Sequence, residues 1–226
     1  MFQRYAIFYT PTGTLADLGA AWLGWDSAAG REVPRLALPG IDAEALTARP
    51  HKYGFHATLK APFGVREDHN LSDLQAATRT FAAQHAPVTA GSMTVQHLHG
   101  FMALRPVEQP VALSTLAAAV VRSFDYLRAP LSDARIAQHR NARLTARQEA
   151  QMLKWGYPYV FEDFRFHLTL TGRVPPDQRQ TVQAALFALL DPAAKHPFVL
   201  DAVTLMGEDP AGRFHQICRC DLTGSA

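Results

Sequence analysis

Two histidines in this 226-residue chain stand in nearly the same short motif. His56 lies in KYGFHATLKAPF and His167 lies in FRFHLTLTGRV, and in both stretches a threonine follows two residues later, Thr58 or Thr169. Apolar and polar residues alternate through both stretches, which predicts half-buried strands. Because side chains on a strand change face with a period of two, each histidine shares a face with its threonine.

These residue types suit chemistry at a phosphate. Imidazole has an unperturbed pKa of about 6.5, so near neutrality one ring can accept a proton while another donates one. If the two strands line one cleft, His56 and His167 can act as general acid and base on opposite sides of a reacting centre. Thr58 and Thr169 can donate hydrogen bonds to the non-bridging oxygens of a phosphate. The pattern favours cleavage of a phosphate ester without a metal.

Three nearby residues are further candidates for substrate contact. Lys60 falls on the predicted face of the first motif histidine, and Arg165 falls on that of the second. Both side chains could offset negative charge that develops on a phosphate. Tyr53, in the first stretch, is the third candidate.

The remaining histidines carry weaker signals. His97 and His99 form H-L-H at a predicted turn and could supply two metal ligands, but the spacing suggests no third. Isolated histidines such as His196 are expected at the surface. We expect no metal and no cofactor.

Periodicity and turn residues predict the elements that position the motifs. Strands are predicted over 4–10, 52–63, 92–98, 101–106, 164–174, 198–206 and 213–222. Helices are predicted over 14–25, 71–85, 111–127, 144–155 and 176–190. Thr145 and Gln148 have the spacing of a capping box at the start of the fourth helix.

These elements predict an α+β fold with an internal repeat. The order strand, helix, strand, strand occurs over 53–106 and again over 164–222, and each copy opens with F-H-x-T-L. We expect a bilobal, pseudo-two-fold arrangement in which two antiparallel sheets line a central cleft and helices pack outside. The helical segment 111–155 lies between the copies, and residues 1–226 form one compact unit rather than two independent domains.

Composition limits the partners and the compartment. Lys and Arg number 22 against 20 Asp and Glu, so the net charge of +2 lacks the excess of a dedicated DNA-binding protein. A small anionic substrate held by local cations fits this balance. Cys218 and Cys220 are the only cysteines, which is typical of reduced thiols in the cytoplasm. No apolar run approaches the roughly 20 residues of a membrane span, and the N-terminus is too polar for a secretory signal.

The two motifs resemble the paired H-x-T motifs of the two-histidine (2H) phosphoesterase superfamily, which includes cyclic phosphodiesterases and enzymes that process RNA 2′,3′-cyclic phosphates. The stretches RYAIFYTP, KYGFHATLKAPF and WGYPYVFEDFRFHLTLTG are similar to the bacterial branch associated with phosphonate-utilisation operons. This resemblance implies a bilobal fold, acid and base roles for His56 and His167, phosphate binding by Thr58 and Thr169, and metal-independent catalysis. For that branch it implies a cyclic phosphate of a phosphorylated ribose as the substrate.

Two other classes of function remain open. An RNA enzyme that acts on 2′,3′-cyclic termini or joins RNA ends would need a basic channel leading from the cleft, and the modest net charge counts against it. A non-catalytic module that captures a phosphorylated metabolite would keep the cleft but would not need two titrating rings. The sequence leaves open which histidine is the acid, and also the oligomeric state.

Overall fold

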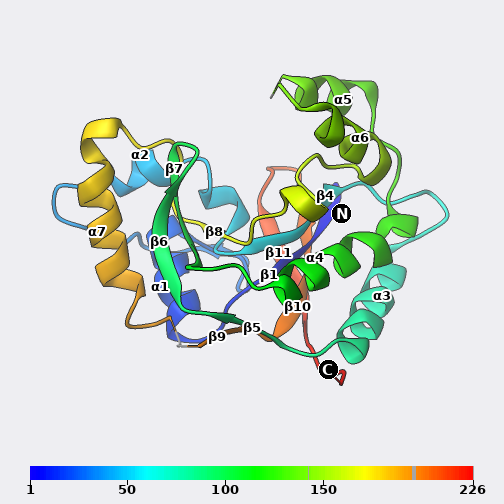
Figure 1. Cartoon of the computed structure of the whole chain (residues 1–226), viewed down its shortest axis with the longest axis horizontal. Coiled ribbons are helices and arrows are strands. Elements are labelled where there is room, and N and C mark those ends of the chain that lie inside the picture. The colour runs from blue at the N-terminus through cyan, green and yellow to red at the C-terminus, as the bar shows by residue number, and fades with distance from the viewer. Residues whose placement is uncertain (142, 195–196, 226) are drawn as a thin grey trace.

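Alternation of apolar side chains builds a sheet with two different faces. In β1 (Arg4–Tyr9) the side chains of Ile7 and Tyr9 enter the main hydrophobic core, whereas Phe8 points the other way. Figure 1 shows this strand within the computed structural model, which describes residues 1–141, 143–194 and 197–225. His196, which we expect at the surface, lies outside these ranges.

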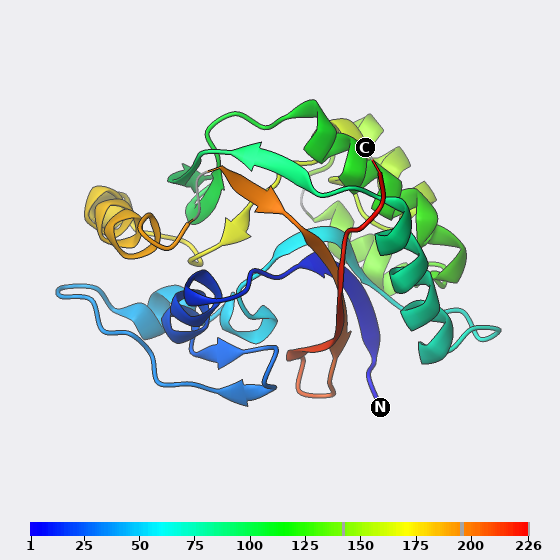
Figure 2. The same ribbon diagram turned by 90° about the horizontal axis from the view of Figure 1, so that it is seen from below.

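The elements that carry the motifs occur in the same order twice. The first repeat comprises β4 (Ala57–Phe63), α3 (Leu71–Gln84), β5 (Val88–Gly91), β6 (Met93–Leu98) and β7 (Phe101–Pro106). The second comprises β8 (Leu168–Thr169), α7 (Arg179–Leu190), β9 (Phe198–Leu200), β10 (Ala202–Glu208) and β11 (Phe214–Asp221). Helices α3 and α7 lie at opposite ends of the molecule (Figures 1 and 2). That the two repeats arose by duplication stays a prediction.

The other elements precede, separate or lead into the repeats. Before the first repeat lie α1 (Thr14–Leu23), β2 (Trp25–Asp26), β3 (Arg31–Glu32), α2 (Ala43–Thr47) and the 3-10 turn η1 (His51–Tyr53). Between the repeats lie α4 (Val111–Ser123), η2 (Asp125–Leu127), α5 (Asp133–Arg140), α6 (Ala146–Trp155) and η3 (Phe161–Asp163). The 3-10 turn η4 (Pro176–Gln178) leads into α7.

The strands form antiparallel sheets, so the predicted α+β class is confirmed. The largest sheet has the order β11-β10-β1-β4-β8-β7-β6, and β5 pairs with β9 beside it. The two repeats interlock, because β8 of the second repeat pairs with β7 of the first. The halves of the large sheet meet where β4 pairs with β8, at a single pair of residues, Ala57 and Leu168. This junction brings the two motifs side by side.

One face of the large sheet packs against helices, and we call the opposite face the site face. Helices α3, α4 and α7 contact β10, β4 and β6 and contribute apolar side chains to the main core. Ala57 and Leu168 point into that core. Their strand neighbours Thr58 and Thr169 therefore lie on the site face.

Several predicted boundaries are wrong near the motifs. The first motif strand begins at Ala57 rather than at residue 52, because η1 and Gly54, whose φ is +71°, turn the chain just before it. The second motif strand contains only the two residues of β8. The helix predicted over 144–155 begins at Ala146, and the predicted capping box of Thr145 and Gln148 is confirmed.

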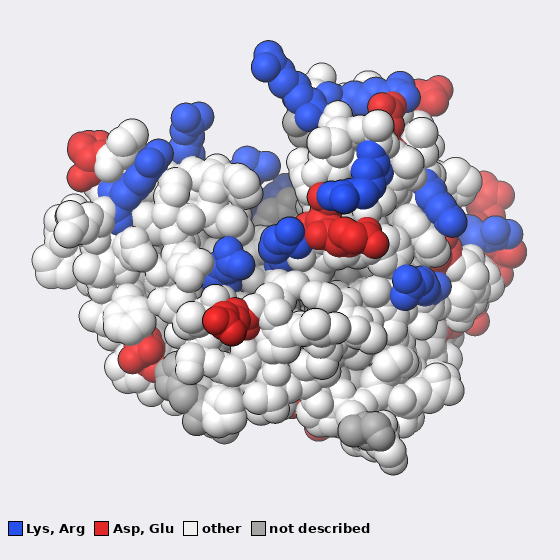
Figure 3. All heavy atoms as spheres, in the orientation of Figure 1, with Lys and Arg blue, Asp and Glu red and all other residues white. Residues whose placement is uncertain are grey.

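The surface is hollowed on the side seen in Figure 3. The hollow lies between the part that carries α2 and α7 and the part that carries α5 and α6, with Lys and Arg side chains on both sides. None of the helices within the described ranges is long and apolar enough to cross a membrane.

Candidate functional site

The junction of β4 and β8 brings the four motif side chains onto one face. Extending the pairing of Ala57 with Leu168 by one residue in each direction places His56 opposite Thr169 and Thr58 opposite His167. The histidines thus occupy one diagonal of a four-cornered arrangement and the threonines occupy the other. Strand spacing and rise give a diagonal of roughly 8 Å between Cα atoms.

His56 is held by its own strand and by the aromatic residues around it. Its Nδ1 lies 3.0 Å from the carbonyl oxygen of Gly54, so Nδ1–H donates to that oxygen and Nε2 is left as an acceptor. Nε2 lies 3.2 Å from Thr58 Oγ1, whose hydroxyl can donate to it. The ring stacks on Phe8 at 3.9 Å between centroids. This packing fixes the ring with Nε2 directed along the site face.

His167 is oriented in the same way from the second motif. Its Nδ1 lies 2.7 Å from the carbonyl oxygen of Arg165, again two residues earlier in the chain, and Nδ1–H donates to it. The Phe101 ring lies 5.7 Å from the imidazole, centroid to centroid. The Nε2 atom of His167 has no hydrogen-bond partner within the part of the chain that the structure describes, so it is available to a ligand.

Both imidazoles favour the neutral form. Burial lowers the pKa of His56 to about 4; the hydrogen bond to Gly54 opposes this shift and the nearby His167 adds to it. Burial also lowers the pKa of His167, with the hydrogen bond to Arg165 opposing it and the charge of Arg105 adding to it. The influence of His167 on the pKa of His56 is consistent with the two rings lying close together.

Gln109 positions the second motif, and no sequence motif marked it. Its side chain accepts a 2.7 Å hydrogen bond from the backbone N–H of Phe166 and donates to the carbonyl oxygen of Phe164. The two hydrogen bonds of this amide take the place of those that a neighbouring strand would make to the backbone just before His167. This explains how β8 can be so short while its histidine remains fixed.

Lys60 does not lie with the motif side chains, and the expectation that it shares their face of the sheet is wrong. The register between β1 and β4 shifts so that Ile7 pairs with Lys60 while Phe8 pairs with Thr58. This β-bulge turns Lys60 toward the helices, where it is 4% exposed and donates to the carbonyl oxygen of Val121. Strict alternation from the motif histidine had placed this ammonium group on the opposite face.

Lys60 also takes part in an ion-pair network away from the site. Its Nζ lies 3.3 Å from Asp125 Oδ1, and the same carboxylate accepts a 2.8 Å hydrogen bond from Arg128. Burial lowers the pKa of Lys60 to about 8, and Asp125 opposes that shift. The network ties β4 to the segment that follows α4.

The other two candidates for substrate contact, Arg165 and Tyr53, differ in where their side chains lie relative to the motifs. The exposed Arg165 guanidinium folds back onto the carbonyl oxygens of Glu162 and Phe164, so the structure does not bring it together with the motif side chains. Only its own carbonyl reaches His167. Tyr53 does lie beside the first motif, with its ring 5.7 Å from that of His56.

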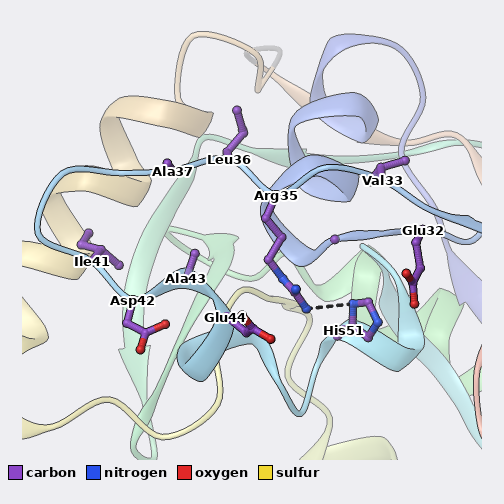
Figure 4. A pocket seen from close by; sticks show the side chains of 11 residues that line it. Glu32, Val33, Arg35, Leu36, Ala37, Ile41, Asp42, Ala43, Glu44 and His51 are labelled. Atoms are coloured by element: carbon purple, nitrogen blue, oxygen red, sulfur yellow. Dashed lines mark hydrogen bonds between the residues drawn. The ribbon is translucent and has the colours of Figure 1, made fainter.

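A cavity of about 600 Å³ opens beside these elements but does not include the motif side chains (Figure 4). Arg35 reaches toward His51 in it, with 3.3 Å between Nη2 and Nδ1. His51 begins η1, the turn that ends at Tyr53. Across the described residues, no three His, Cys, Asp or Glu side chains are grouped to hold a metal ion.

The chain matches a described protein family. Residues 58–215 match the family model described as a protein of unknown function (DUF1045), which is more than half of the chain, so the chain belongs to this family. It is 36% identical over 223 residues to a Janthinobacterium sp. (strain Marseille) protein named ribose 1,5-bisphosphate phosphokinase PhnN. That similarity covers 92% of this chain and 48% of the relative. The chain spans about half the length of the curated relatives it matches.

Solved structures with a similar chain course include two from other bacteria. The Thermus thermophilus protein TT0787 is 16% identical, with a TM-score of 0.47 over 99% of this chain and 100% of that one. The E. coli protein LigT, solved in complex with 3′-AMP, is 14% identical, with a TM-score of 0.46 over 99% of both chains. Both TM-scores are below 0.5.

Proposed function

We propose that this chain is a two-histidine phosphoesterase that opens a sugar cyclic phosphate to a phosphomonoester. The observation that carries the proposal is the diagonal pair His56 and His167 on one face, each with Nδ1 bound to the carbonyl two residues earlier. We infer that two rings held in this way on one face direct both Nε2 atoms toward a common space. General acid–base catalysis at phosphorus needs such an arrangement.

We assign the base role to His56. Its pKa of about 4 keeps the ring neutral at physiological pH, so Nε2 can accept a proton from water. In the free protein the Thr58 hydroxyl donates to this atom, and it can rotate to donate to a phosphate oxygen when substrate binds. The water then attacks phosphorus as its proton passes to Nε2.

We assign the acid role to His167. Its ring is half-buried, whereas His56 is 8% exposed, so it is less strongly held in the neutral form. The negative charge of a bound phosphodiester favours imidazolium, and Nε2–H then gives its proton to the sugar oxygen as the P–O bond breaks. The products are an alcohol and a phosphomonoester. Afterwards His56 holds a proton and His167 lacks one, and exchange with solvent restores both.

The finer proposal concerns the substrate. We propose a ribose cyclic phosphate that carries a second phosphate, used in phosphonate catabolism, as the motif resemblance implies. The relatives are named for phosphorylation of ribose 1,5-bisphosphate, and this chain spans about half of their length. A ribose 1,2-cyclic phosphate with a 5-phosphate opens to ribose 1,5-bisphosphate when the bond to O2 breaks. That product is the compound in the relatives' name, which supports this substrate.

A substrate panel tests the proposal. Wild type, His56→Ala and His167→Ala are assayed with ribose 1,2-cyclic phosphate 5-phosphate, nucleoside 2′,3′-cyclic phosphates and an RNA oligonucleotide ending in a cyclic phosphate. We expect hydrolysis of the ribose compound and a loss of about 10²- to 10⁴-fold in kcat with either variant. A folded variant that keeps near wild-type turnover would contradict the mechanism. Preference for the oligonucleotide would favour an RNA enzyme, and ligand-induced stabilisation without turnover would favour a binding module.

A further inference from the structure

The site face continues from the second motif onto β7. Ala103 pairs with Thr169 and Leu104 pairs with Leu168, so Arg105 falls opposite His167 when the register is extended by one residue. Directly opposite residues point to the same face of an antiparallel sheet. Arg105 therefore lies on the site face, one strand beyond His167 on the side away from His56.

The Arg105 guanidinium has no partner within the described residues. Its Nε is buried, and no carboxylate, carbonyl or hydroxyl in those ranges accepts a hydrogen bond from it. Three other partly buried arginines of this protein are paired with carboxylates: Arg4 with Glu208, Arg128 with Asp125, and Arg219 with Asp201. A buried donor without an acceptor destabilises the fold, and more so when it is charged. An anionic ligand would remove that cost.

The charge of Arg105 acts on the motif. It is the charged group that adds to the lowering of the pKa of His167, so it lies within electrostatic reach of that ring. Its position is outside the diagonal pair, because His167 separates it from Thr58 and His56. A phosphate centred between the two histidines has the threonine hydroxyls as donors. Arg105 is better placed for a second group on the same substrate.

We propose that Arg105 binds a second anionic group of the substrate, the phosphomonoester at the end remote from the cyclic phosphate, and so determines specificity for a phosphorylated sugar. The planar guanidinium presents up to five N–H donors and can hold a phosphate through two parallel hydrogen bonds. This inference rests on the proposed function for the identity of the substrate. It assigns to Arg105 a role that no motif in the sequence marks.

The first test compares two substrates that differ by one phosphate. Ribose 1,2-cyclic phosphate is assayed with and without the 5-phosphate, using wild type, Arg105→Gln and Arg105→Lys. We expect Arg105→Gln to lower kcat/KM for the 5-phosphorylated compound by about 10²-fold and for the other by less than about threefold. The kcat/KM of Arg105→Lys should lie between those of wild type and Arg105→Gln, because lysine keeps the charge but lacks the paired N–H donors of the guanidinium. Equal losses on both substrates, or no loss on either, would overturn the proposal.

The control variant is Arg179→Gln. The Nε of Arg179 is likewise buried without a partner among the described residues, but this residue begins α7, which packs on β6 over the core. Removing its charge should leave the ratio of the two kcat/KM values unchanged. A change in that ratio as large as that of Arg105→Gln would show a general charge effect and overturn the assignment.

A binding measurement separates this inference from the proposed function. Calorimetry with ribose 5-phosphate, which has no cyclic bond, needs no catalysis. We expect Arg105→Gln to weaken binding at least about 30-fold, with Arg179→Gln close to wild type. If no cyclic phosphate is hydrolysed but this difference holds, the inference stands and the proposed activity fails. If hydrolysis occurs and ribose 5-phosphate binds Arg105→Gln as well as wild type, the inference fails alone.

Discussion

The segments that carry His56 and His167 share a motif but differ in what surrounds them. The first leads directly into the seven-residue strand β4, with an aromatic ring stacked on a histidine that is 8% exposed. The second lies at the two-residue strand β8, held by the Gln109 side chain, with a half-buried histidine. In both segments, the hydrogen bond from Nδ1 to the carbonyl oxygen two residues earlier fixes the tautomer of the histidine.

This difference teaches how a repeat can acquire two chemical roles. Equal motifs give equal orientation, because the hydrogen bond from Nδ1 is local to each segment. Burial is not local, since it depends on the neighbouring strands and rings. The stronger burial of His56 holds its pKa at about 4, while burial also lowers the pKa of His167 and the charge of Arg105 adds to that shift. We therefore expect unequal acid and base roles from nearly equal sequences.

The largest difference that we expect beyond the histidines themselves concerns the two threonines. Thr58→Val and Thr169→Val should each lower kcat/KM by about 10- to 100-fold, because each removes a hydrogen bond to an anion worth roughly 1.5–3 kcal/mol. Thr58→Val should cost more, since this hydroxyl also bonds His56 Nε2. Steady-state kinetics on a cyclic phosphate measures both. A clearly larger loss of kcat/KM for Thr169→Val than for Thr58→Val would contradict this expectation.

The pH dependence of stability isolates the burial of His56. The folded pKa of about 4 lies below the unfolded value of about 6.5, so between these pH values the unfolded chain binds more protons. The contribution of His56 to stability is fully present above pH 6.5 and is lost as the pH falls through 4. The linked free energy is about 3 kcal/mol.

Urea unfolding of wild type and His56→Asn at pH 7 and pH 4 measures this contribution. The advantage of wild type over the variant should shrink by about 3 kcal/mol at the lower pH. The matched variant His167→Asn should show a smaller change. An advantage that does not vary with pH would mean that His56 is not buried in the neutral form.

Much of the site could be predicted from sequence, and the exceptions have a common cause. His56 and His167 stood out because their motifs repeat, which needs no knowledge of strand pairing. Lys60 was misplaced because a bulge between β1 and β4 reverses its face, and strict alternation cannot foresee a bulge. Gln109 and Arg105 reach the second motif from segments remote in sequence. Only the register of β7 against β8 reveals Arg105.

The smallest effect on activity should come from Lys60→Met. Because the ammonium group lies under the sheet with Val121 and Asp125, we expect kcat/KM to stay within about threefold of wild type. Stability should fall by about 1–3 kcal/mol, because one buried partner is lost while Arg128 still pairs with Asp125. Kinetics and thermal unfolding measure the two effects. A rise in KM of tenfold or more would show that Lys60 contributes to substrate binding.

The division of labour between the two histidines is tested most directly by changing the leaving group. His56→Ala and His167→Ala are compared with wild type on a sugar cyclic phosphate and on a nitrophenyl phosphodiester, whose leaving group needs no proton. Loss of the acid should matter only for the sugar oxygen, so His167→Ala should lose at least about 10²-fold on the cyclic phosphate and less than about tenfold on the nitrophenyl ester. His56→Ala should lose similar factors on both. Rescue of His56→Ala instead, or of neither variant, would contradict the assignment of His56 as base and His167 as acid.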